Sequence, residues 1–107
     1  MASSVIAGSV SAVLQTNHVV GTIVTAGVYV AKVDLGSLQN GDEVELRFAD
    51  VCSFSGTLSV AYSASYAHVQ GTQIKVSPPV VVTRSAQFMI KQVAGVGRIF
   101  NFDVVSI

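Results

Sequence analysis

Large apolar residues alternate with small or polar residues along several segments of this chain. In the segment 56–66 the two sets fall on opposite faces of an extended chain: Leu58, Val60, Tyr62, Ala64 and Tyr66 against Thr57, Ser59, Ala61, Ser63 and Ser65. Residues 42–50 repeat the pattern, with Val44, Leu46 and Phe48 on the apolar face. A period of two is typical of half-buried β-strands, and no stretch carries a convincing helical period of 3.6 residues. The alternation therefore predicts an all-β protein.

Turn-forming residues divide the chain at nearly even intervals. Glycines mark the expected strand ends: Gly27, Gly41, Gly56, Gly71, Gly95 and Gly97. Further strands are expected over residues 19–25, 27–35, 72–77, 80–93 and 98–107. Pro78-Pro79 marks a strand end, a sheet edge or a corner between sheets, because proline cannot donate a ladder hydrogen bond. About seven or eight short strands predict an antiparallel β-sandwich, and a jelly roll is one topology that fits.

Two local pairings follow from the turn residues. Asn40-Gly41 is a strong hairpin signal, and it predicts a tight reversal before the strand at 42–50. The apolar, β-branched segment 19–25 is expected to pair with 27–35 across Ala26-Gly27.

The length of 107 residues suits one domain. We assign residues 15–107 to a single β-sandwich and residues 1–14 to an extended N-terminal arm or a first strand. Serines interrupt the apolar residues of this N-terminal segment, which also lacks the basic start of a signal peptide. No window has the roughly 20 apolar residues of a transmembrane helix.

Charge is scarce on this chain. Only 11% of the residues are charged, six acidic against six basic, whereas a soluble domain usually carries about 25%. A neutral, weakly charged surface favours association, so we expect much of the surface to be covered by other protein, including further copies of the chain. The basic residues are scattered singly, which argues against a nucleic-acid partner. The single cysteine, Cys52, excludes an intrachain disulfide and favours assembly in a reducing cytoplasm.

No residue pattern predicts a metal, a cofactor or a catalytic site. His18, His68 and Cys52 could supply ligands to a metal, but no pair of them has ligand spacing. Cys52 has no neighbouring base in the sequence and is expected to be a small buried apolar residue. Glu43 and Glu45 are expected on a solvated outer face or in a salt bridge between subunits, rather than as paired catalytic acids.

Two further patterns have structural explanations. Gly95-Val96-Gly97 lacks the Lys-Ser/Thr ending of a phosphate-binding loop, so a tight turn between strands is expected. Tyr62 and Tyr66 share a strand face, where they pack into the core or form a platform for carbohydrate. The chain is therefore not expected to be an enzyme.

Three segments resemble small structural proteins of tailed bacteriophages: residues 34–47, 76–80 and 90–107. The last one, IKQVAGVGRIFNFDVVSI, is similar to an ending of the form LKQTAGTGRxFxWxIL that recurs in these proteins. This chain has Val93, Val96 and Phe102 where that ending often has Thr, Thr and Trp. The resemblance implies a component of the virion and transfers no functional residue.

The expected function combines this resemblance with the low charge. A capsid decoration (cement) protein fits both, because it buries much of its surface against the head shell and against its own copies. Its partners would be a major capsid or other virion protein and itself, with a trimer expected on local three-fold positions. Its location would be the virion, after assembly in the host bacterial cytoplasm. A neck, collar or tail-associated protein is the alternative within virions, and a carbohydrate-binding module is the alternative outside them.

Overall fold

The computed structural model describes residues 3–51 and 56–107, and these residues form strands and connections without a helix. The strands are β1 (Ser3–Ser11), β2 (Asn17–Ile23), β3 (Gly27–Asp34), β4 (Glu43–Asp50), β5 (Ser59–Ala67), β6 (Ile74–Val76), β7 (Val80–Val82), β8 (Ala86–Ala94) and β9 (Ile99–Ser106). The predicted all-β class is confirmed.

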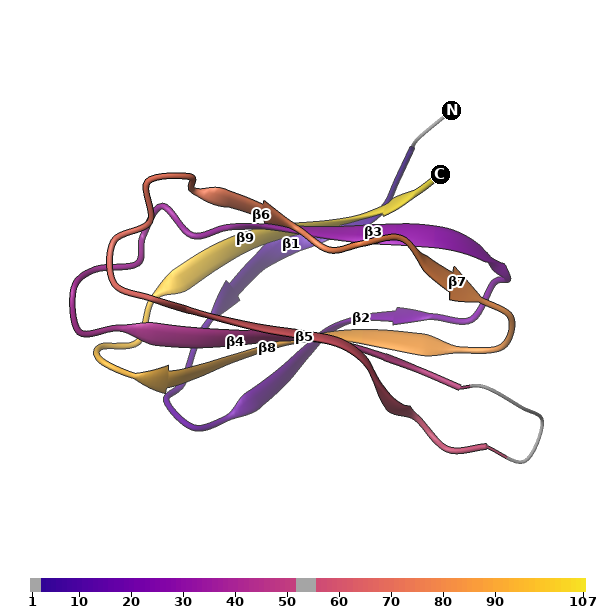
Figure 1. Cartoon of the computed structure of the whole chain (residues 1–107), viewed down its shortest axis with the longest axis horizontal. Helices are drawn as coiled ribbons and strands as arrows, with labels where there is room; N and C mark the ends of the chain where they lie inside the picture. The colour runs from indigo at the N-terminus through magenta and orange to yellow at the C-terminus, as the bar shows by residue number, and fades with distance from the viewer. Residues whose placement is uncertain (1–2, 52–55) are drawn as a thin grey trace.

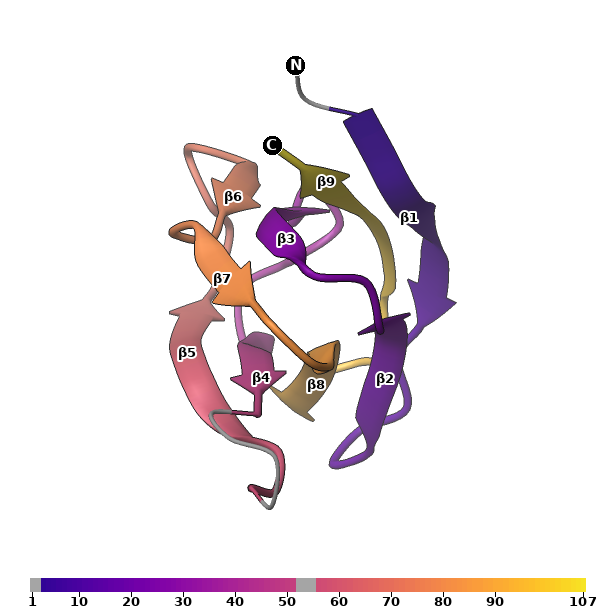
Figure 2. The ribbon, with the colours of Figure 1, turned by 90° about the vertical axis from the view of Figure 1, so that its right-hand side faces the viewer.

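The strands form two antiparallel sheets that pack face to face (Figures 1 and 2). One sheet has the order β1-β9-β3-β6, with β7 also paired to β3, and we call it the first sheet. The second sheet has the order β2-β8-β4-β5. Since β6 and β7 occupy the same side of β3, they count as one interrupted strand. The strand order is then that of an eight-stranded jelly roll.

The Pro78-Pro79 pair causes this interruption. Ser77 stands just before it, donates its N–H to Ala31 O (2.8 Å) and accepts the Ala31 N–H at its Oγ (2.9 Å). The Ser77 hydroxyl also donates to Pro78 O (3.0 Å). The side chain thus takes the place of a ladder partner where the prolines provide no N–H. The expectation of a break at this dipeptide is confirmed.

Both predicted local pairings were wrong. Gly41 adopts a positive φ of 94°, as a turn glycine does, but β3 and β4 belong to different sheets. Likewise β2 and β3 pack in opposite layers instead of pairing. In a jelly roll most consecutive strands change sheets, and the crossing needs the same turn residues as a hairpin. The segment 80–93 also divides into two strands, β7 and β8, which belong to different sheets.

The core lies between the sheets and is built from the inward residues of nearly every strand. Its largest fully buried apolar side chains are Phe48, Phe88, Phe100, Leu35, Leu38 and Ile90. The rings of Phe48 and Phe88 lie 6.0 Å apart on neighbouring strands of the second sheet. Burial of each such side chain contributes about 1.5–3 kcal/mol to folding, so this layer supplies much of the stability.

The N-terminal segment forms the first strand of the fold. β1 lies at an edge of the first sheet and pairs with β9 from Ser3–Ser106 to Ser11–Ile99, with a bulge between Ser4 and Ile6. Ile6 and Val10 pack against the core. The bulge shifts the inward-facing positions of β1 by one residue. This shift explains why the apolar residues of the segment do not alternate regularly in the sequence.

Candidate interaction surface

One part of the outer face of the first sheet is apolar. In β3 the alternate residues Tyr29, Ala31 and Val33 are buried in the core. Val28 and Val30 must then point to the opposite side, away from the second sheet. They lie between two neighbouring strands, with Val28 paired to Val81 of β7 and Val30 paired to Val105 of β9.

These residues and their neighbours form a continuous patch that we call the valine face: Val28, Val30, Val76, Val81, Val105 and Ile107. Val81 is 64% exposed, Ile107 60% and Val76 54%, while Val28, Val30 and Val105 are half-buried. The Ile107 N–H donates to Val28 O (2.9 Å), which ties the C-terminus to this patch. Single exposed apolar side chains are common, but a contiguous patch marks a site of interaction.

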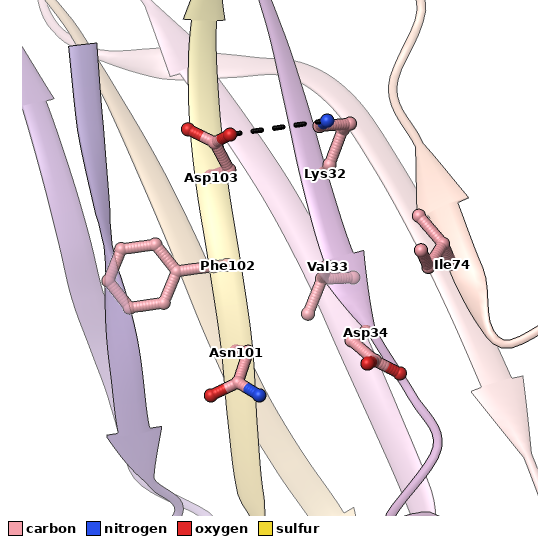
Figure 3. Close-up of a pocket in the computed structure, with 7 residues that line it drawn as sticks. All are labelled: Lys32, Val33, Asp34, Ile74, Asn101, Phe102 and Asp103. Carbon is pink, nitrogen blue, oxygen red and sulfur yellow. Dashed lines mark ion pairs between the residues drawn. The ribbon is translucent and has the colours of Figure 1, made fainter. Parts of the chain in front are cut away.

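The neighbouring part of the same face carries Lys32, Asp34, Asn101 and Asp103 (Figure 3). A shallow depression of about 180 Å³ lies along β3, β6 and β9. Its lining residues are Lys32, Val33, Asp34, Ile74, Asn101, Phe102 and Asp103. The depression borders the valine face, because Val76 is the cross-strand neighbour of Lys32.

The charged groups of the depression are engaged with one another and with the backbone. Lys32 Nζ lies 4.0 Å from Asp103 Oδ2, and the Ser4 hydroxyl donates to Asp103 Oδ1 (2.6 Å). Asp34 Oδ1 accepts the Gly36 N–H at 2.8 Å. The lining contains no histidine, cysteine or serine that a base could activate. This part therefore has the character of a polar rim beside an apolar contact area.

Each of the two histidines accepts a hydrogen bond from a backbone N–H group in a connection between strands. His18 Nε2 accepts the Val13 N–H (3.0 Å), and His68 Nδ1 accepts the Gly41 N–H (3.0 Å). His18 is on β2 and His68 follows β5, which are the two opposite edges of the second sheet. Cys52 lies outside the described residues. Within the part of the chain that the structure describes, no three His, Cys, Asp or Glu side chains are grouped to hold a metal ion.

The remaining candidates have structural contacts. Glu45 is ion-paired with Arg47 two residues along the same strand. Glu43 begins β4 and is half-buried. Gly95 and Gly97 lie in the connection between β8 and β9, so the expected turn is present.

Tyr62 and Tyr66 are partly buried and pack against the core. Burial and the neighbouring Tyr62 hydroxyl raise the pKa of Tyr66, and Lys75 Nζ lies 5.0 Å from the centre of its ring. The two tyrosines therefore do not form a flat, open platform.

The sequence analysis did not identify a buried polar cluster at one end of the sandwich, formed by Asp42, Gln92 and Arg98. Asp42 is 2% exposed and accepts hydrogen bonds from Arg98 Nε (2.7 Å), Gln39 N (2.9 Å) and Val96 N (3.0 Å). Gln92 is fully buried; it accepts the Arg98 N–H and donates to the carbonyl oxygen of Val96 (2.6 Å). These contacts fix the β8–β9 turn against the β3–β4 connection.

The protonation of Asp42 reflects two opposing effects. Burial by itself raises the pKa of its carboxyl group, since a charge is costly in a dry environment. The hydrogen bonds from Arg98, Gln39 and Val96, together with the Arg98 charge, outweigh burial and hold the pKa below its ordinary value. Asp42 is thus a charged structural residue, and all of its described partners belong to this chain.

Comparisons with protein-family models, with curated proteins and with solved structures find no match. No helix in the described residues is long and apolar enough to cross a membrane.

Proposed function

We propose that this chain is a structural protein of a tailed bacteriophage virion, and specifically a capsid decoration protein that stabilises the head shell by protein–protein contacts. The observation that carries the proposal is the valine face, an uncharged patch of aliphatic side chains on one outer sheet surface. The resemblance of residues 34–47, 76–80 and 90–107 to phage structural proteins supports the same role.

The valine face has the composition of a contact area rather than of a reaction site. The centres of protein–protein interfaces are depleted of charge and packed with apolar side chains, and polar residues form their rims. Here Val28, Val30 and Val81 correspond to such a centre, and Lys32 and Asp103 to its rim. Jelly rolls occur in capsid proteins, but also in lectins and cupins, so the fold alone does not decide between these functions.

The test is a localisation combined with a surface variant. The protein should be present in many copies on purified particles of the phage that encodes it, counted by quantitative mass spectrometry. Val81→Lys places a charge in the valine face without touching the core, because Val81 is already 64% exposed. We expect this variant to lose co-sedimentation with heads.

The matched control is Ser63→Lys, which adds the same charge at an exposed position of the second sheet. It should bind heads as the unchanged protein does. If the protein is confined to necks or tails, the decoration role is wrong and the alternative within virions holds. If it is absent from particles, the virion role itself is wrong.

A further inference from the structure

The two edges of the first sheet differ in how they are protected against pairing with another strand. The β6–β7 edge is broken by Pro78-Pro79, its two strands have three residues each, and it carries Lys75. The β1 edge is a nine-residue strand without a charge or a proline. Long uncharged edges present unpaired N–H and C=O groups to other chains, and monomeric proteins usually avoid them.

The register shows which backbone groups of β1 are available. Ala31 exchanges hydrogen bonds with Ser77, so its N–H and C=O point towards β6–β7. The directions of the N–H and C=O groups alternate from one residue to the next along an antiparallel strand, so Val30 and Lys32 bond to the odd-numbered residues of β9. The even-numbered residues of β9 therefore bond to β1 on its other side.

The partners of those even-numbered residues include Ile6, Gly8 and Val10. The hydrogen bond from Ala12 N to Arg98 O (2.8 Å) continues the same series. The N–H and C=O groups of Ala7, Ser9 and Ser11 therefore point away from the sheet.

We propose that a second copy of this chain pairs antiparallel with β1, about a two-fold axis at Ser9. This register places Ser9 opposite Ser9 of the second copy and Ala7 opposite Ser11 of the second copy. The free groups of the two strands then form about six backbone hydrogen bonds. The side chains that face each other in this register are small and uncharged, so their own bulk and charge do not oppose the approach.

A second copy is the occupant that the exposed side chains favour. The exposed positions around the axis are self-complementary, since Ala7, Ser9 and Ser11 are all exposed and carry small, uncharged side chains. The pair formed by Ala7 and Ser11 occurs on both sides of the axis, as a two-fold interface requires. The pairing leaves the valine face free, so it does not rest on the virion role and is measured on the purified protein alone. It predicts a dimer in solution in place of the trimer expected from the sequence.

The experiment uses Ser9→Lys and Ser9→Glu in the full chain, with sedimentation measured up to about 100 µM protein because dimers dissociate on dilution. The unchanged protein should sediment as a dimer. Each variant should weaken the dimer at least about tenfold, since like charges then face each other across the axis. Mixing the two variants should restore the dimer, because lysine and glutamate are then opposite each other.

The control is Ser63→Lys on β5, the nine-residue uncharged edge strand of the second sheet. It should remain dimeric. Circular dichroism confirms that each variant is folded, and the uncharged variant Ser9→Gln should keep the dimer, which assigns the loss in the charged variants to their charge. The proposal is overturned by a monomeric or trimeric unchanged protein, by mixing without recovery, or by dissociation only in Ser63→Lys.

Discussion

Removal of the Asp42 carboxylate is the sharpest test of how the end of the sandwich is held together. In Asp42→Ala, Arg98 Nε and the N–H groups of Gln39 and Val96 lose their acceptor. Arg98 keeps its charge in a partly buried position, since 29% of its side chain is exposed. The β8–β9 turn then loses its attachment to the β3–β4 connection.

The magnitude follows from the burial of the pair. Breaking a buried ion pair by removing one partner costs about 3–5 kcal/mol. Because water reaches part of the Arg98 side chain, we expect the lower end, about 3 kcal/mol. For a domain of this size the melting temperature falls by at least about 4 °C per kcal/mol, so the expected loss is about 12 °C or more.

The assay is thermal unfolding followed by circular dichroism, with Asp103→Ala as the matched control. Asp103 also faces a cation, but its side chain is 31% exposed and the Lys32–Asp103 separation is 4.0 Å, against 2.7 Å for Arg98–Asp42. Such exposed pairs contribute at most about 1 kcal/mol. If the two variants melt within about 3 °C of each other, a clamping role for Asp42 is refuted.

Three further outcomes are expected. The pKa of Asp42 in the folded protein lies below 3.8, so its contribution to the free energy of unfolding is complete above that pH and is lost as the pH falls further. Acid unfolding of Asp42→Asn should therefore depend less on pH below about 4 than that of the unchanged protein. Gly97→Ala should destabilise by about 1–3 kcal/mol in urea unfolding, because the new Cβ would lie 2.6 Å from Ala12 O, whereas Gly71→Ala, with open space around it, should not. The pKa of Tyr66 is raised above 10.0, so stability should fall as pH rises through that range, and Tyr66→Phe should reduce the fall in alkaline unfolding curves.

The strands were predictable because each needs only local alternation and a turn residue at its end. The segments 42–50 and 27–35 correspond closely to β4 and β3. Their partners were not predictable in this way, because pairing depends on which sheet a strand enters after the turn. Asn40-Gly41 reverses the chain in a hairpin and in a crossing between sheets alike, so its sequence does not distinguish the two.

The inward faces were predicted where the register is regular and were wrong beyond a bulge. In β5, Tyr62, Ala64 and Tyr66 lie opposite Phe48, Leu46 and Val44, as the alternation required. Leu58 and Val60, which were placed on the same face, are 40% and 53% exposed. The register shifts between Phe48 and Ala49, which changes the relation between alternation and burial from that point.

The valine face was not identified from the sequence because the first half of β3 is apolar on both sides. Tyr29 and Val33 enter the core while Val28 and Val30 do not, and only the sheet order decides which pair is covered. The Asp42 cluster was hidden for another reason. Its three side chains come from segments that meet only after the chain has folded.

The proline break between β6 and β7 limits how far the first sheet can grow. A strand added at that edge would meet two successive residues that offer no N–H, so no continuous ladder can form there. In the proposed dimer the opposite edge is occupied by the second copy, so extension of the first sheet ends at two chains. Fibrous growth through the first sheet, which needs an open edge on both sides of every subunit, is thereby excluded in that dimer, so a chain rich in valine and poor in charge can associate along this sheet only into assemblies of finite size.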